Sequence, residues 1–228
     1  MYNPQAFAME ASSDILAALR QISFGHLVTH TGDVVPGIAF MSTPLPFVID
    51  DELSSVRAHF ARANHHWRQI DHTDALLIVA HADAYISPRW YPSKAEHGKV
   101  VPTWNYEVIH LHGSAEIHDE AEWKLELVND LTDHNEALVG VSDGGVPWEV
   151  SDAPSDFIDA QLKAIVGVEL TVTSIDGKRK LSQNKPEHDR SGATEGLART
   201  GRPGDAAVGS LMATIGSSTP AAGRSHPT

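Results

Sequence analysis

Long segments with the residue pattern of β-strands, separated by few helical segments, constrain the fold of this chain more than any other feature. Residues 75–80 are continuously apolar, residues 107–117 alternate between polar and apolar side chains, and residues 165–175 form another long strand-like segment. Parallel strands would each need a long crossover, so many strands with few helices favour a closed antiparallel barrel over a doubly wound sheet. We therefore expect a mainly β fold with flanking helices.

Shorter segments complete the expected elements. Ser12-Ser13-Asp14 is typical of a helix start, and the apolar spacing that follows predicts a helix near residues 13–22. Two strands are expected at residues 25–31 and 34–42, joined by a tight turn at Thr31-Gly32-Asp33. Residues 44–49 contain two prolines, which cannot donate to a ladder, and predict a short edge strand. Further helices are expected at residues 120–136, 156–163, 185–199 and 205–213.

The composition changes after Asn184. We expect a barrel domain with inserted helices at residues 1–184 and a helical extension at residues 185–214. Ser, Thr, Pro, Gly and Ala dominate the last residues, so a disordered tail is expected at 215–228.

The charge balance and the missing cysteines exclude several classes of protein. There are 17 Lys and Arg residues against 30 Asp and Glu, a formal net charge of −13, so a broad electrostatic surface for nucleic-acid phosphates is absent. With no cysteine there is no disulfide framework and no thiolate nucleophile. No apolar run approaches the roughly 18 residues of a membrane span, and the N-terminus does not resemble a signal peptide. We expect a soluble, cytoplasmic protein without a membrane partner.

Two neighbouring segments have the side chains that a planar, phosphorylated cofactor needs, because flat rings can stack on it and cations can bind its phosphate. They are residues 85–94 and 101–106, which lie around Pro-containing turns. The candidate cofactor contacts are Ser87, Trp90, Tyr91, Lys94, Thr103, Trp104, Asn105 and Tyr106. Lys94 is the first candidate for the phosphate, Asn105 for a ring edge, and Trp104 for a ring face or for ordinary barrel packing.

A third set of candidates lies on a predicted strand end, where His59, Arg62 and Asn64 alternate. Arg62 is expected to donate to a phosphate or ring edge, or else to form a surface salt bridge. The nearby histidines His65, His66 and His72 lack a familiar ligand spacing, so no metal is expected. No Ser-His-Asp or Cys-His nucleophile is evident, so we expect no catalytic side chain, and any chemistry would be carried by the cofactor.

The one concentrated basic cluster closes the last long strand. It contains Lys178, Arg179 and Lys180, followed by the polar residues Ser182 and Gln183. Lys180, Ser182 and Gln183 are candidate cofactor contacts, reached from a partner's arm in a dimer. Lys178, Arg179 and Lys180 could instead form a small DNA-binding patch, or the segment could be a solvated turn. No helix-turn-helix pattern with a basic recognition helix is visible elsewhere, so direct DNA reading has little support.

Several of these motifs together resemble the PaiB-type family of FMN-binding negative transcriptional regulators, over roughly residues 1–200. The resemblance rests on these segments: Met1-Tyr2-Asn3-Pro4, His59-Phe60-Ala61-Arg62-Ala63-Asn64, Trp67, Tyr85-Ile86-Ser87-Pro88, Trp90-Tyr91, Lys94, residues 101–106 and residues 178–184. It implies an FMN-binding split β-barrel of the flavin-reductase and pyridoxamine-phosphate-oxidase type, and a homodimer with FMN at the subunit interface. In one departure, this chain has Asn64-His65 where the family usually has Asn-Pro. Without the proline, residue 65 has a backbone N–H and the conformation of Asn64 is less restricted, so Asn64 can still cap a helix.

The resemblance and the composition point to different functions. The resemblance implies a negative transcriptional regulator, with flavin as its redox input. The acidic charge and the missing DNA-reading helix favour an FMN-dependent oxidoreductase acting on a small molecule. A haem-handling enzyme is a further alternative, because related split barrels include such proteins.

Overall fold

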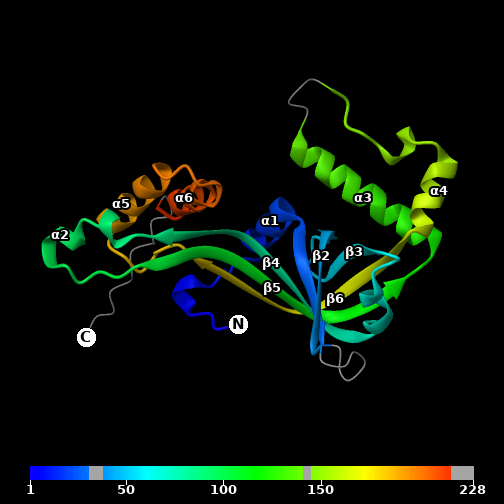
Figure 1. Cartoon of the computed structure of the whole chain (residues 1–228), viewed down its shortest axis with the longest axis horizontal. Coiled ribbons are helices and arrows are strands. Elements are labelled where there is room, and N and C mark those ends of the chain that lie inside the picture. The colour runs from blue at the N-terminus through cyan, green and yellow to red at the C-terminus, as the bar shows by residue number, and fades with distance from the viewer. Residues whose placement is uncertain (31–37, 141–144, 217–228) are drawn as a thin grey trace, which may run out of the picture. The chain divides into compact units, whose positions relative to one another are not determined.

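A closed barrel of six strands organises the chain (Figure 1). The computed structural model describes residues 1–30, 38–140 and 145–216. The strands are β1 (Phe24–His30), β2 (Phe40–Ile49), β3 (Ser55–Ala61), β4 (Thr73–Ile86), β5 (Thr103–His118) and β6 (Ile165–Lys180). Around the barrel their order is β1-β2-β3-β6-β5-β4, and the pairs β1–β2, β1–β4, β2–β3 and β3–β6 are antiparallel. The expected mainly β, antiparallel fold is confirmed.

Helices flank the strands, and among the described residues the short α-helix at 93–97 is the one that the sequence did not predict. The α-helices are α1 (Ser12–Ile22), α2 (Ser93–His97), α3 (Ala121–Val139), α4 (Ser155–Lys163), α5 (Glu187–Ala198) and α6 (Pro203–Gly216). Single 3-10 turns are η1 (Gln5–Phe7), η2 (His65–Gln69), η3 (Pro88–Trp90) and η4 (Val150–Asp152). In the part of the chain that these ranges cover, no helix is long and apolar enough to cross a membrane.

The chain divides into two compact units, and each is described by itself. Unit 1 comprises Met1 and residues 9–80 and 109–177, and unit 2 comprises residues 2–8, 81–108 and 178–228. Both units therefore contain segments that are distant in sequence. The expected domain boundary at residue 184 lies inside unit 2. Helix α6 continues through Gly216, past the expected start of the tail at residue 215, and the rest of the expected tail lies outside the described residues.

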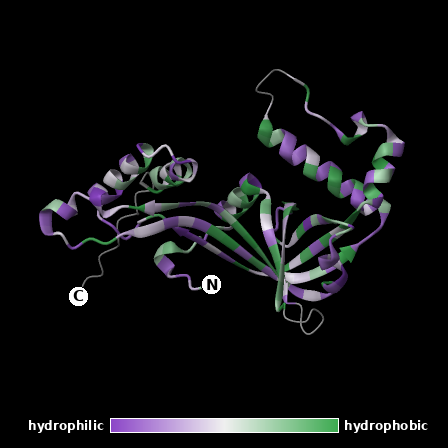
Figure 2. Cartoon of the chain, viewed as in Figure 1, coloured by the Kyte–Doolittle hydropathy of each residue, from purple (hydrophilic) through white to green (hydrophobic). Residues whose placement is uncertain are grey.

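Alternation along the strands builds the core of unit 1. In β3 the buried residues Val56, Ala58 and Phe60 are separated by half-buried ones, and Figure 2 shows hydrophobic and hydrophilic bands along the barrel strands. The amphipathic helix α1 adds Ile15 and Leu19 to the same hydrophobic cluster. Apolar side chains on one side of each element thus leave water together, which is the main favourable term in folding.

The prolines of β2 do not mark an edge strand, so that prediction is wrong. Residues 40–49 form one strand between β1 and β3. Pro44 and Pro46 lie opposite β1 residues, and pairing with β3 begins only at Phe47. The missing proline N–H groups are tolerated because they precede the part of β2 that is paired on both sides. The expected turn at residues 31–33 lies outside the described residues.

Candidate functional site

Three aromatic side chains and two lysines lie together at the strand ends in unit 2. In β5, Asn105 and Glu107 are buried, so the alternate residues Trp104 and Tyr106 point to the other side of the strand. Trp104 is 48% exposed, and its ring meets that of Tyr85 edge-on at a centroid distance of 6.1 Å. We call Tyr85, Trp104, Tyr106, Lys178 and Lys180 the aromatic–lysine face.

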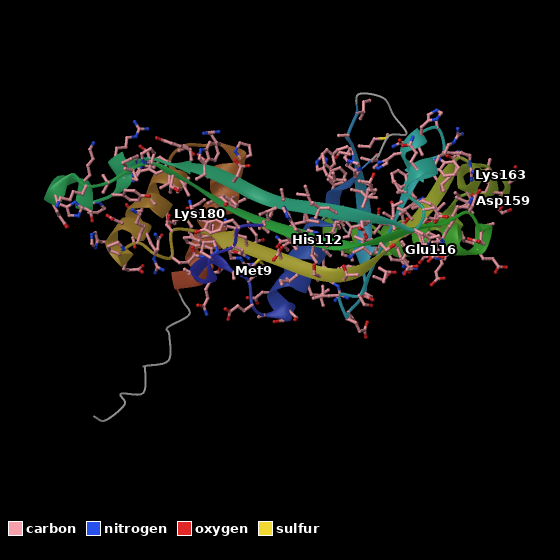
Figure 3. All side chains as sticks on the ribbon, turned by 90° about the horizontal axis from the view of Figure 1, so that it is seen from below. Met9, His112, Glu116, Asp159, Lys163 and Lys180 are labelled. Atoms are coloured by element: carbon pink, nitrogen blue, oxygen red, sulfur yellow. The ribbon has the colours of Figure 1, made fainter. Side chains whose placement is uncertain are left out.

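The two lysines of this face are held in place by groups that do not neutralise them. Lys180, labelled in Figure 3, donates from Nζ to the Thr103 hydroxyl and to the Trp104 carbonyl oxygen. Lys178 Nζ donates to the carbonyl oxygen of Tyr2 at 2.9 Å. The Lys178 and Lys180 ammonium groups lie 5.5 and 5.9 Å from the centre of the Tyr106 ring, within cation–π range. Burial first, and then the positive charges of Lys178 and Lys185, lower the pKa of Lys180.

Arg179 points away from this face. Its Nε donates to the carboxylate of Glu107, whose side chain is only 1% exposed. The other oxygen of this carboxylate, Glu107 Oε1, lies 3.1 Å from His81 Nδ1, and it accepts a hydrogen bond in the tautomer in which Nδ1 carries the proton. The three consecutive cations expected to act together are therefore divided: Arg179 pairs with the buried Glu107 carboxylate, and Lys178 and Lys180 lie on the aromatic–lysine face.

Two predicted contacts lie inside unit 2. The Ser182 hydroxyl donates to Asn105 Oδ1 at 3.0 Å, and Asn105 Nδ2 donates to the sulfur of Met212 at 3.3 Å. Both residues are buried. Gln183 closes the local turn, with its side chain accepting from the Leu181 N–H at 2.7 Å. In this arrangement these three side chains support the strand end, and a ligand contact from them stays a prediction.

The segment 87–94 contributes mostly packing. Tyr91 is 2% exposed and belongs to the hydrophobic cluster of unit 2, where burial raises the pKa of its phenol. Trp90 packs against α5 so closely that a Cβ on Gly196 would lie 2.2 Å from its ring. Ser87 is half-buried, and its carbonyl accepts from the Trp90 N–H. Lys94 is exposed on α2.

Arg62, in unit 1, is fully engaged with protein acceptors. Its guanidinium pairs with Asp119 through both terminal nitrogens, and its Nε donates to the carbonyl of Lys163 at 2.6 Å. The hydrogen bond from Arg62 lowers the pKa of Asp119 to about 2. The predicted phosphate contact would require Arg62 to leave these partners. The structure instead contains the alternative expected from the sequence, a salt bridge of Arg62, here with Asp119.

His59 is the predicted residue of unit 1 that has a buried atom without a partner. Among the described residues its Nδ1 has no hydrogen-bond partner, and burial lowers the pKa of the ring. A cavity of about 380 Å³ is lined by His59 together with Pro46, Thr132, Asn135 and Trp148. Asn64 instead has a local role, since its side chain accepts from the His66 N–H at 3.0 Å and caps η2. The capping expected from the sequence is confirmed.

The sequence analysis missed some residues that the structure brings to these places. Tyr85 belongs to the aromatic–lysine face, and the Tyr2 ring lies 5.5 Å from the Lys178 ammonium of that face. The sequence analysis named neither tyrosine as a cofactor contact and named Lys178 only as a DNA contact. Lys185 lies over the Tyr91 ring at 5.3 Å. The position of Lys185 directly after the basic cluster in the sequence could have identified it as a candidate. Throughout the described ranges there is no group of three or more His, Asp or Glu side chains able to hold a metal ion.

The donor set fits FMN. The aromatic–lysine face combines the exposed rings of Tyr85 and Trp104 and the half-buried ring of Tyr106 with the ammonium groups of half-buried Lys180 and buried Lys178, which within the described residues have no carboxylate partner. A flat ring system and a phosphate dianion are the chemical complements of these groups. The unpartnered His59 Nδ1 in unit 1 is a further polar atom that could serve a ligand.

Comparisons with known proteins identify relatives over most of the chain. The protease synthase and sporulation protein PAI 2 of Bacillus subtilis is 31% identical over 213 residues, which are 93% of this chain and 96% of that protein. An uncharacterised protein of Aspergillus fumigatus is 32% identical over 200 residues, covering 70% of this chain and 77% of the relative.

Solved structures share the fold at low sequence identity. A conserved hypothetical protein from Mycobacterium tuberculosis aligns with a TM-score of 0.55 at 13% identity, covering 82% of this chain and 95% of that one. The flavocytochrome Anf3 from Azotobacter vinelandii aligns with a TM-score of 0.52 at 17% identity, covering 76% of this chain and 69% of that one. The family model described as "Putative FMN-binding domain" matches residues 1–174. The chain therefore belongs to this FMN-binding family, with a split β-barrel fold and FMN as its cofactor.

Proposed function

We propose that this protein is a negative transcriptional regulator of the PaiB type, with the redox state of bound FMN as its input. The observation that carries the proposal is the aromatic–lysine face. Trp104 and Tyr106 would lie against the flavin rings, while Lys180 and Thr103 would bind polar groups of the cofactor. FMN supplies the capacity to accept and donate electrons, which no side chain of this cysteine-free protein offers.

Two observations support the regulatory output. The relative named for protease synthesis and sporulation matches along 93% of this chain, so the similarity is not confined to a cofactor-binding segment. The outer side of the β1–β2 pair also has large exposed side chains, with Phe24 49% and Phe40 65% exposed. Such a surface would suit a homodimer, which is part of this proposal together with a cytoplasmic location.

An FMN-dependent oxidoreductase acting on a small molecule is the second candidate. The division of the basic cluster favours the oxidoreductase. Arg179 is bound to buried Glu107, so of the three consecutive cations only Lys178 and Lys180 lie together on one side of β6. A molecule of net charge −13 with two such lysines has a weak electrostatic basis for binding DNA.

An absorbance spectrum of the purified protein tests both candidates. FMN is added, unbound flavin is removed by desalting, and NADH or NADPH is then added without oxygen. Retained flavin that does not bleach supports the regulator, and retained flavin that bleaches rapidly makes the oxidoreductase primary. Trp104→Leu should weaken FMN binding roughly 3- to 10-fold by removing a stacking partner. Phe157→Leu, a change at a 53% exposed aromatic residue of α4, is the matched control.

A further inference from the structure

Three lysines gather in unit 2 without an acidic partner. We call Lys178, Lys180 and Lys185 the lysine triad. In the described part of the chain, none of them forms an ion pair with a carboxylate. Lys178 and Lys185 are close enough to Lys180 that their charges lower its pKa, in addition to the larger effect of burial. Gathered like charges repel each other, so this arrangement stores an unfavourable interaction that an anion would relieve.

The triad is also preorganised. Lys180 is fixed by the Thr103 hydroxyl and the Trp104 carbonyl, and Lys178 by the Tyr2 carbonyl. The rings of Tyr106 and Tyr91 lie beneath these ammonium groups at 5.3 to 5.9 Å. An ammonium has three donors. Since the protein occupies two on Lys180 and one on Lys178, donors remain for a ligand with several acceptor oxygens.

The other cations considered for the cofactor phosphate are less suitable. Arg62 pairs with Asp119, and Arg179 pairs with Glu107, so neither has its charge available. Lys94 is exposed on α2. A phosphate monoester carries nearly two negative charges at pH 7, which favours a cluster of cations over a single one.

We propose that the lysine triad is a phosphate-binding site and that its ligand is the phosphate monoester of FMN. This inference rests on the proposed function and refines it, because it transfers the phosphate contact from Lys94 to Lys180 and its two neighbours. The two aromatic residues Trp104 and Tyr106 then lie beside the phosphate site, within the same unit.

Riboflavin differs from FMN only in lacking the phosphate, so paired titrations isolate this contact. Flavin fluorescence is titrated with the wild-type protein and with Lys180→Gln, Lys185→Gln and the control Lys94→Gln. Lys180→Gln should reduce the preference for FMN over riboflavin roughly 10- to 100-fold, by removing a charge-assisted hydrogen bond. Lys185→Gln should reduce it by less, and Lys94→Gln should leave it unchanged.

The outcomes distinguish this inference from the proposed function. If the wild-type protein prefers FMN and neither triad variant changes that preference, the lysine triad is not the phosphate site, although the protein still binds flavin. If the wild-type protein binds neither flavin, the proposed function fails and the inference fails with it. Lys185 makes no hydrogen bond to the protein through its ammonium in the described structure, so Lys185→Gln removes the charge and its cation–π contact with Tyr91 but no hydrogen bond. Thermal unfolding of each variant verifies folding.

Discussion

His66 is a fully buried imidazole whose two ring nitrogens face threonine hydroxyls. Its Nε2 lies 2.7 Å from Thr29 Oγ1, and its Nδ1 lies 2.8 Å from Thr43 Oγ1. Asn64 completes the group by donating to the Thr43 hydroxyl at 3.1 Å. The residue that follows the departure from the family pattern therefore joins β1 and β2 to η2, through hydrogen bonds within unit 1.

Stability should depend on the protonation of His66. Burial lowers the pKa of this imidazole, so the folded state favours its neutral form. The stability contributed in this way is fully present above the pKa of an unfolded histidine, about 6.5, and is lost as the pH falls below that value toward the folded pKa. The free energy of unfolding should therefore decrease between about pH 7.5 and pH 5, as measured by urea denaturation.

His66→Gln separates this residue from the others. The pKa values of His59 and His110 are also lowered, chiefly by burial, so the variant should show a weaker pH dependence rather than none. If the change in the free energy of unfolding between these two pH values is the same in His66→Gln as in the wild-type protein, His66 does not contribute to the pH dependence.

At the scale of elements, α5 and η3 approach each other through glycines. A Cβ on Gly192 would lie 2.2 Å from the Trp90 carbonyl oxygen, and one on Gly196 would lie 2.2 Å from the Trp90 ring. These positions lie one helical turn apart and therefore share a face of α5. The indole of Trp90, a predicted cofactor contact, is thus partly covered by α5, which follows it by about a hundred residues in the sequence.

Gly196→Ala should destabilise unit 2 by about 1–3 kcal/mol, because the added methyl group forces Trp90 or α5 to move. Gly209→Ala in α6 is the matched control, since its Cβ would meet only Leu197 Cβ at 3.9 Å. That change should stabilise the protein by about 0.5–1 kcal/mol through helix propensity. Equal unfolding midpoints for the two variants would contradict the close packing described for Gly196.

At the scale of the whole molecule, charge limits how DNA could be bound. The net charge is −13, and two lysines of the cluster at residues 178–180 lie on the same side of their strand. Each phosphate neutralised contributes about −0.9 to the slope of log affinity against log salt. Binding through Lys178 and Lys180 should therefore give a slope of about −2, measured by fluorescence anisotropy with a labelled duplex.

The contribution of Arg179 can be tested in the same titration. Because Arg179 is tied to Glu107, the double change Arg179→Gln with Glu107→Gln, which removes both charges of the pair, should leave the slope unchanged. A slope near −6 would require a basic surface other than these lysines. FMN should also compete with the duplex if both ligands use Lys180.

Much of the fold was predictable because its signals are local. A continuous apolar run predicted the strand now seen as β4, alternation of side chains predicted β5, and a long strand-like segment predicted β6. Start signals and apolar spacing predicted α1, α3, α4 and α5. The edge-strand prediction for residues 44–49 was wrong because a proline shows only that an N–H is missing. It does not show which neighbour pairs with that part of the strand.

The candidate site was predictable only in part. Trp104, Tyr106 and Lys180 lie together, whereas Asn105 points into unit 2 and Arg62 is paired in unit 1. A basic residue in a sequence gives no sign of whether a carboxylate will reach it, and in this chain the partners of Arg62 and Arg179 are 57 and 72 residues away. Such pairs form only when the barrel brings distant strands together.

The sequence alone determined the β-rich architecture, the acidic charge and the membership in an FMN-binding family, because composition, periodicity and motifs are properties of the chain itself. The tertiary structure alone decided which cations remain available for an anion. Within unit 2 it paired half-buried Arg179 with buried Glu107 and left Lys178, Lys180 and Lys185 without a carboxylate among the residues described. The physical reason is that electrostatic pairing depends on distance in space, which strand pairing and packing fix and sequence separation does not.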